Sequence, residues 1–152
     1  MVNKHESARS LALSVLEQVF DQGAYSNIAL NKALESSRLS AQDKGLVTEL
    51  VYGTVSRKIT LEWYLARFIE DREKLDTWVY YLLMLSLYQL LYLDKLPIHA
   101  VVNEAVQIAK RGRGTDKFVN AVLRKISQTS LPSPSDIKRK NKRLSIQYSV
   151  TV

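Results

Sequence analysis

The segment Thr77–Leu93 constrains the fold of this chain most, because it is apolar on nearly every face of a helix. Only Ser86 and Gln89 interrupt it. A membrane-spanning helix needs about 20 apolar residues, whereas this segment is shorter, contains four tyrosines and has acidic residues on both flanks. A helix that is apolar all round is typical of the centre of a helical bundle. We therefore predict a buried central helix and no membrane partner.

Apolar residues repeat at spacings of three and four along the rest of the chain as far as Gln128, which is the pattern of amphipathic helices. No segment alternates with the period of a strand, and the chain has no internal repeat. The sequence therefore predicts an all-α domain built around the central helix. The expected helices cover approximately residues 4–21, 26–34, 40–54, 61–69, 98–109 and 115–126.

Residues with strong terminal preferences support these helix boundaries. Gly23 stands where a helix commonly ends in a left-handed residue. Ser26, Ser40 and Thr115 are expected N-caps, because a hydroxyl oxygen can accept from an unpaired N–H of the first turn. Gly53 lies inside an expected helix, where it costs up to about 1 kcal/mol relative to alanine. A close helix crossing would explain its presence.

The two expected helices at 98–109 and 115–126 are joined by the basic turn Arg111–Gly114. Ile98 and Phe118 each fall on an apolar stripe, and we expect both to be buried. A packed helix pair with a cationic corner can hold a phosphate backbone. The alternative is a solvated helical hairpin whose charges only keep it in solution.

Charge is distributed unevenly along the chain. The net charge is +7, from 22 Lys and Arg against 15 Asp and Glu. Before Lys110 there are 11 basic and 13 acidic residues, whereas the interval from Lys110 to Arg143 holds 11 basic residues against Asp116 and Asp136. Such asymmetry points to a polyanionic partner, nucleic acid before membrane.

The composition changes after Gln128. Residues 129–135 are rich in Ser and Pro and are expected to form a linker. Residues 136–152 are strongly basic and carry too few apolar side chains to form a core alone. We therefore expect a domain at 1–128, a linker at 129–135, and at 136–152 the beginning of a further region.

The sequence shows no arrangement of residues that is typical of a catalytic or cofactor site. The chain has no cysteine, and His5 and His99 stand alone. None of the five glycines follows a strand pattern, so no dinucleotide or S-adenosylmethionine loop is visible. We predict no catalytic, cofactor-binding or metal-ligating residue in this chain. The absence of cysteine fits a cytoplasmic location. Polar residues interrupt Met1–Ser14 and argue against a signal peptide.

Several motifs resemble, in the same order, those of the NusB-like fold, and together they cover most of residues 4–128. Lys44 departs from the pattern, since the family usually has arginine there. The matching stretches are Ala8–Arg9, Ser26–Asn27, Leu30–Asn31, Ser40–Lys44, Thr48–Val55, Tyr88–Asp94, Pro97–Lys110 and Lys117–Arg124.

Within that fold the chain resembles the N-terminal domain of the bacterial small-subunit ribosomal RNA (cytosine-5)-methyltransferases, the RsmB or Sun/Fmu family. The residues after the linker, Arg143–Ser149, look like the entry to a methyltransferase region, whereas NusB-type chains end soon after their last helix. The resemblance implies two packed helical subdomains and an RNA-binding role. The domain would help a tethered methyltransferase, which uses S-adenosylmethionine, to engage ribosomal RNA. Its catalytic cysteines and cofactor site would lie beyond this chain.

Two other functions remain open. The chain could be a free-standing antitermination factor that regulates transcription by binding RNA together with a ribosomal protein. It could also be a purely structural helical domain that packs on a catalytic neighbour.

Charge and resemblance together predict where RNA would bind. We expect the start of the first helix and the turn before the last one to form a single cationic face. Arg57 and Lys58 also belong to the candidates, although a polar break between helices explains them equally well. The complete set is Lys4, Arg9, Arg57, Lys58, Lys110, Arg111, Arg113, Lys117, Arg124 and Lys125.

Overall fold

The computed structural model describes residues 6–129 and residue 131. These residues form seven α-helices and one short 3-10 helix, with no strand among them, which confirms the all-α prediction. The predictions for Lys4, for most of the linker and for residues 136–152 lie outside the described residues. The elements are α1 (Ala8–Gln22), α2 (Ser26–Ser36), α3 (Ala41–Ser56), α4 (Lys58–Leu65), η1 (Arg72–Lys74), α5 (Thr77–Tyr92), α6 (Ile98–Ala109) and α7 (Thr115–Gln128).

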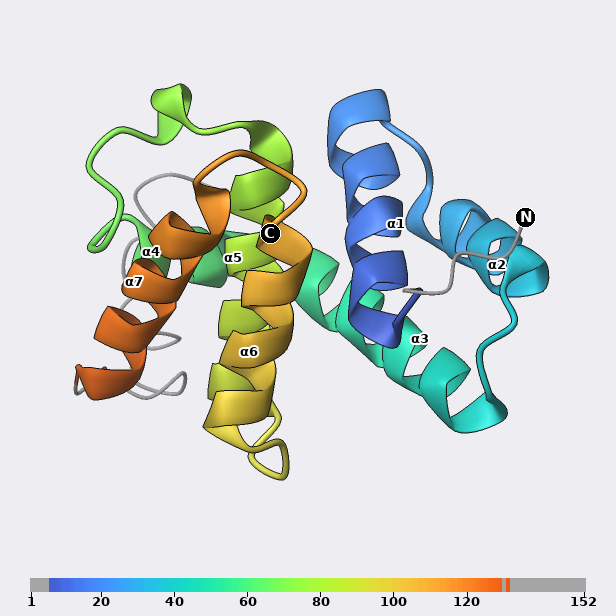
Figure 1. The fold of residues 1–152 in the computed structure, drawn as a ribbon. Coiled ribbons are helices and arrows are strands. Elements are labelled where there is room, and N and C mark those ends of the chain that lie inside the picture. Colours follow the sequence, from blue (N-terminus) through green and yellow to red (C-terminus); the bar gives the residue numbers. More distant parts are fainter. Residues whose placement is uncertain (1–5, 130, 132–152) are drawn as a thin grey trace, which may run out of the picture.

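The helices form two subdomains (Figure 1). Helices α1, α2 and α3 pack on one another in the first, and α4, α5, α6 and α7 form the second. Helix α5 also packs against α1 and α3, so it contacts helices of both subdomains. Every residue from Trp78 to Gln89 is buried, including Ser86 and Gln89. The prediction of a buried central helix is confirmed.

Two of the predicted helix ends have the expected geometry. Gly23 ends α1 in the left-handed region, with φ at 71°. The Ser40 hydroxyl accepts from the Asp43 N–H at 3.1 Å and caps α3. Helix α1 begins at Ala8, later than expected, where Ser7 and Ser10 bond reciprocally in a capping box.

The N-cap predictions for Ser26 and Thr115 are wrong. Each is the first residue of its helix, and the N-caps are Tyr25 and Gly114, neither of which makes a side-chain capping bond. The chain enters α7 through Gly114 at a φ of 73°, a conformation that favours glycine. The hydroxyl pattern was correct to within one position, but the glycine conformation decided where α7 begins.

The expected burial of Ile98 and Phe118 is also wrong. Ile98 is 55% exposed and Phe118 is 36% exposed. Each lies in the first turn of its helix, and the apolar stripe becomes buried further along, at Val101 and Val119. Helical spacing therefore identified which face of α6 and of α7 is buried. It did not show that the first turn of each helix extends beyond the residues that pack on that face.

One row of side chains on α1 joins the two subdomains. Arg9, Leu13, Glu17 and Asp21 follow one another at intervals of four, which places them along one side of the helix. Leu13 is buried in the core. The polar members contact the second subdomain as follows: Arg9 with Gln89 and Glu104, Glu17 with Arg111, and Asp21 with Thr77 and Tyr81.

Candidate functional site

The turn between α6 and α7 rests directly on Trp78, the second residue of α5. A Cβ at Gly112 would come within 2.4 Å of Thr115 Oγ1 and 3.0 Å of the Trp78 ring. A side chain at Gly112 would therefore crowd Thr115 and Trp78, and Gly114 has a positive φ that favours glycine. The turn thus packs closely on the start of α5.

Arg111 attaches this turn to both subdomains. Its Nη1 and Nη2 each donate to the Glu17 carboxylate at 3.1 Å, across to α1. Its guanidinium carbon lies 4.6 Å from the centre of the Trp78 ring. Arg111, which the sequence predicted only as an RNA contact, is already engaged in an ion pair.

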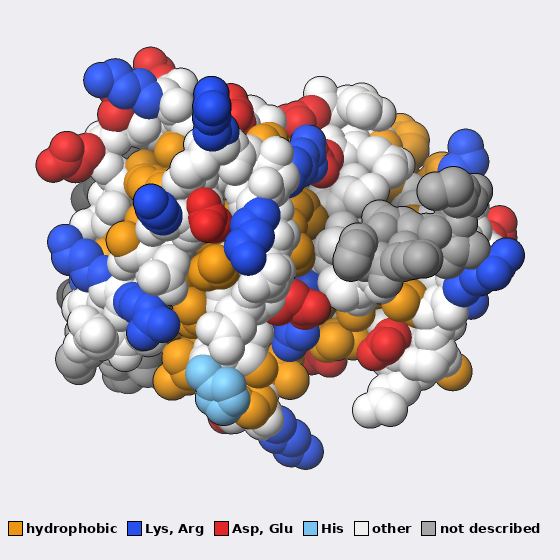
Figure 2. All heavy atoms as spheres, in the orientation of Figure 1, with side chains coloured by type: hydrophobic (Ala, Val, Ile, Leu, Met, Phe, Trp, Pro, Cys, Tyr) orange, Lys and Arg blue, Asp and Glu red, His pale blue; other side chains and the backbone are white. Residues whose placement is uncertain are grey.

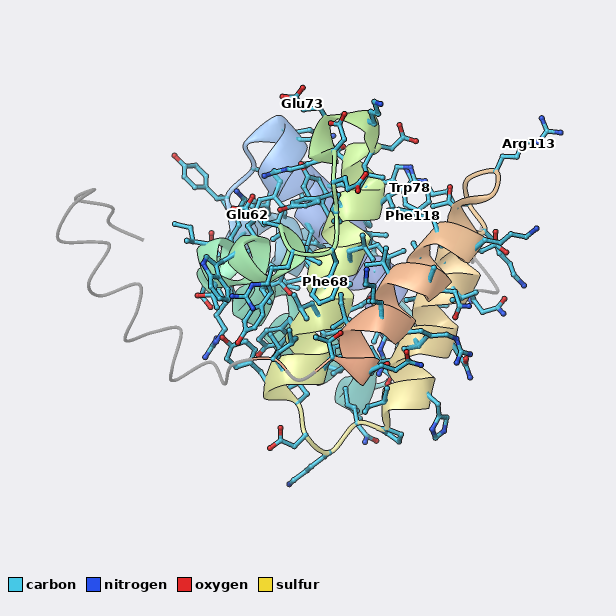
Figure 3. All side chains as sticks on the ribbon, turned by 90° about the vertical axis from the view of Figure 1, so that its left-hand side faces the viewer. Glu62, Phe68, Glu73, Trp78, Arg113 and Phe118 are labelled. Atoms are coloured by element: carbon cyan, nitrogen blue, oxygen red, sulfur yellow. The ribbon has the colours of Figure 1, made fainter. Side chains whose placement is uncertain are left out.

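A shallow hollow of about 240 Å³ opens beside the turn. Its sides come from the approach to α5 and from the first turn of α7, and they include the partly exposed ring of Phe118. Figure 3 shows Arg113 extending outward from the turn. The lining residues are Lys74, Leu75, Asp76, Val79, Arg113, Gly114, Thr115 and Phe118.

Three exposed cations surround the turn and define what we call the basic turn face: Lys110, Arg113 and Lys117. None of the three forms an ion pair within the described part of the chain. Lysine and arginine side chains outnumber acidic ones over α6 and α7 on the face seen in Figure 2, although an acidic side chain lies among them. The basic turn face can therefore accept an external anion without first breaking an internal pair.

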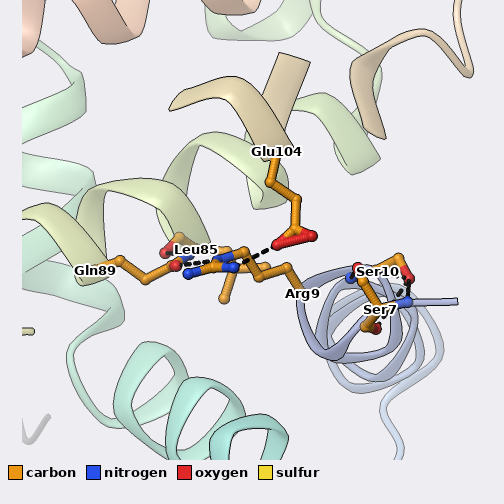
Figure 4. Close-up of polar contacts among 6 residues, drawn as sticks. All are labelled: Ser7, Arg9, Ser10, Leu85, Gln89 and Glu104. Carbon is orange, nitrogen blue, oxygen red and sulfur yellow. Dashed lines mark hydrogen bonds and ion pairs between the residues drawn. The ribbon is translucent and has the colours of Figure 1, made fainter. Parts of the chain in front are cut away.

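Arg9 was predicted to share one cationic face with the α6–α7 turn, but its side chain lies elsewhere. Its side chain reaches between the subdomains, where it donates to the Gln89 side chain and to the Glu104 carboxylate (Figure 4). Only 16% of the side chain is exposed. The structure thus places Arg9 in the contact between α1, α5 and α6, apart from the basic turn face.

The remaining candidates are dispersed. The Arg57 guanidinium carbon lies 4.4 Å from the centre of the Tyr92 ring, and Lys58 pairs with Glu62 at 3.2 Å. Arg124 donates to the Asn120 side chain at 2.9 Å. Lys125 is exposed near the end of α7, without an ion pair among the described residues. Of the candidates that the structure describes, it brings together those at the α6–α7 turn.

Sequence reasoning missed Phe118 and Lys74 as neighbours of the basic residues. Phe118 follows Lys117 directly, so its place next to a cation could have been noticed, but helical spacing assigned it to the core. Lys74 is distant in sequence and reaches the hollow only through the fold. No local signal indicated that position.

Within residues 6–129 and 131, no group of histidine, aspartate or glutamate side chains has the arrangement of a metal site. Over the same residues, every helix is too short or too polar to cross a membrane.

Comparison with known proteins identifies relatives along most of the chain. The model of the NusB family matches residues 6–128. A probable ribosomal RNA small subunit methyltransferase B of Bacillus subtilis is 45% identical over 148 residues, which are 96% of this chain and 33% of that protein. The corresponding protein of Synechocystis is 35% identical, again over 33% of its length. The chain thus spans about a third of these methyltransferases.

Free-standing NusB proteins are similar over nearly their whole length. The transcription antitermination protein NusB of Ruminiclostridium cellulolyticum is 33% identical over 83% of this chain and 90% of that protein. A solved structure of Thermotoga maritima NusB superposes with a TM-score of 0.74, covering 82% of this chain and 91% of that one, at 24% identity. The second comparison establishes the fold.

Proposed function

This chain belongs to the NusB family, and we propose that it is an RNA-binding domain whose basic turn face holds the phosphates of a single-stranded segment of ribosomal RNA. The observation that carries the proposal is the cluster of Lys110, Arg113 and Lys117 around the α6–α7 turn, none of them engaged by a carboxylate in the described structure. When unpaired cations of this kind bind the phosphates of a nucleic acid, the counterions around those phosphates are released, which favours binding.

The hollow beside the turn supports a preference for unpaired nucleotides. Proteins recognise single-stranded RNA by stacking splayed bases on aromatic rings while cations hold the backbone. Phe118 offers a partly exposed ring in the hollow, and Arg113 and Lys74 flank it. In a uniform duplex the bases are stacked on one another, so the ring would have no free base to contact. We therefore assign Phe118 to base stacking and Arg113 to phosphate binding.

The methyltransferase relatives suggest what this binding serves. We propose that the domain helps a following methyltransferase domain, in the same polypeptide and in the cytoplasm, to engage small-subunit ribosomal RNA for cytosine-5 methylation. The described residues contain no strand-to-helix glycine loop that would fit S-adenosylmethionine. In this proposal the cofactor, which donates the methyl group, belongs to the catalytic domain, and this chain contributes RNA positioning alone.

A second function is favoured by one observation, the 90% coverage of the Ruminiclostridium NusB protein. On that basis the chain would act as an antitermination factor that binds RNA together with a ribosomal protein. The two functions differ in what they require: the first requires a catalytic domain in the same polypeptide, and the second a separate protein that increases RNA affinity. Titration of the chain with RNA, with and without added ribosomal proteins, distinguishes them.

The proposal is tested by measuring the affinity of the whole chain for a mixed-sequence single-stranded RNA of about 16 nucleotides, the upper end of the site sizes known for OB-fold domains. The double variant R113A/K117A should bind more weakly than the unaltered chain. The matched control is K32A/R38A, which removes the same charge from exposed positions on and after α2. Equal weakening by both variants would show only a general charge effect and would contradict the proposed site. Equal affinity of all three proteins would leave the structural role as the better account.

A further inference from the structure

We infer that Glu17 is an intramolecular competitor of RNA, which occupies Arg111 in the free domain and gives way when a phosphate binds there. The inference rests on the proposed function and adds a regulated contact to the same turn. It assigns a role to an acidic residue on α1, far in sequence from the cations of the basic turn face.

The geometry of Arg111 leaves it accessible to an external anion. A guanidinium group has five N–H donors in a fixed fork, and the Glu17 carboxylate takes one from each of Nη1 and Nη2, both at 3.1 Å. Trp78 supports the group from one side at 4.6 Å. The Arg111 side chain is still 52% exposed. It is therefore accessible to a phosphate that approaches from solvent, and in the sequence it lies between the cations Lys110 and Arg113.

The pair of Glu17 with Arg111, which joins α1 to the turn after α6, differs from the pair that joins α1 to α6 itself. In the pair of Arg9 with Glu104, the arginine side chain is only 16% exposed, so separating it would leave a charge poorly solvated. Arg111 is more than three times as exposed, and exposed ion pairs contribute little to stability. Phosphate and carboxylate oxygens accept from the arginine fork in the same bidentate manner. A phosphate that replaces Glu17 can therefore make the same two hydrogen bonds with Arg111.

The consequence is that Glu17 lowers RNA affinity by keeping one cation of the turn neutralised. Release of Arg111 would add one phosphate contact to those of the basic turn face. Simple repulsion between Glu17 and RNA would also lower affinity, but that effect does not depend on Arg111. The two explanations are separated by removing each residue alone and both together.

The experiment measures the affinity of the whole chain for the same single-stranded RNA at several salt concentrations. The variant E17Q, which keeps the side-chain length, should bind roughly two- to fivefold more tightly, as expected for loss of an exposed ion pair. Its salt dependence should steepen by roughly 0.7 in log affinity per log salt, which corresponds to one additional phosphate contact. In an R111A background, E17Q should have little effect.

The matched control is D116N, which removes a negative charge from the first turn of α7, where Asp116 forms no ion pair among the described residues. It should give a smaller gain than E17Q, because no arginine is freed. Unchanged or weaker binding by E17Q, or an equal gain in the R111A background, would overturn the inference. If R113A/K117A weakens binding while E17Q does not tighten it, the inference alone fails. If the unaltered chain binds no RNA, the proposed function fails as well.

Discussion

Gly53 of α3 lies directly against the ring of Tyr88 on α5. A Cβ added at Gly53 would come within 2.1 Å of Tyr88 Cζ and 2.3 Å of its hydroxyl oxygen. The ring cannot move aside easily, because Tyr88 is buried and stacks on Tyr92 with 5.3 Å between ring centres. This contact sets how closely the first subdomain approaches the central helix.

Substitution G53A should therefore destabilise the fold by about 1–3 kcal/mol, the usual cost of overpacking a core. The control is G45A on the same helix, where an added Cβ would meet nothing within 4 Å. Since alanine is the better helix former, G45A should stabilise by roughly 0.5–1 kcal/mol. Denaturant melts of the two variants should thus shift in opposite directions. A shift of both in the same direction would contradict the close crossing.

The central position of α5 predicts a large effect at Leu87, whose side chain has no exposed surface. Substitution L87A should cost about 2–5 kcal/mol, because it removes buried methyl groups and leaves a cavity. Ile28, which is 54% exposed on α2, is the comparison. I28A should change stability by no more than about 0.5 kcal/mol. Chemical denaturation measures both, and a loss below that value for L87A would rule out a core position.

Tyr81 should make the fold sensitive to alkaline pH. Burial, and then the hydrogen bond that its hydroxyl donates to Asp21, raise the pKa of Tyr81 from 10.0 to about 12. Because the pKa is higher in the folded chain, its contribution to stability is complete below pH 10 and is lost as the pH rises towards 12. Stability measured by denaturant melts should fall over that interval. In Y81F the fall should be smaller but not absent, since burial and nearby Glu62 also raise the pKa of Tyr80 to about 12. An equal fall in both proteins would contradict this assignment.

The main features of the fold were predictable because they depend on local patterns. The apolar segment specified the central helix, and Gly53 indicated a close crossing before its partner, Tyr88, was known. Contacts between distant residues were not predictable. Arg9 and Glu104 are 95 positions apart, as Glu17 and Arg111 are 94 apart, and no spacing rule connects residues so far separated. For the same reason, the sequence indicated ten candidate RNA-binding cations but did not show which of them are held in ion pairs.

Phe118 is expected to contribute stacking to RNA binding without contributing charge. Substitution F118A should weaken binding by about 1–3 kcal/mol, the usual value for one stacked base. The salt dependence should stay unchanged, because no phosphate contact is removed. F118L is the control, since it keeps apolar volume but removes the aromatic face, and it should bind nearly as weakly as F118A. Full affinity of F118L would show that the ring acts only by filling space.

The most direct test of the central claim is the salt dependence of RNA affinity in the unaltered chain, in R113A/K117A and in the control K32A/R38A. Each phosphate contact on a single strand contributes roughly 0.7 to the slope of log affinity against log salt. If the basic turn face holds phosphates, the slope of R113A/K117A should be shallower by roughly 1.4, while the control keeps the original slope. The same slope in all three proteins would contradict the account.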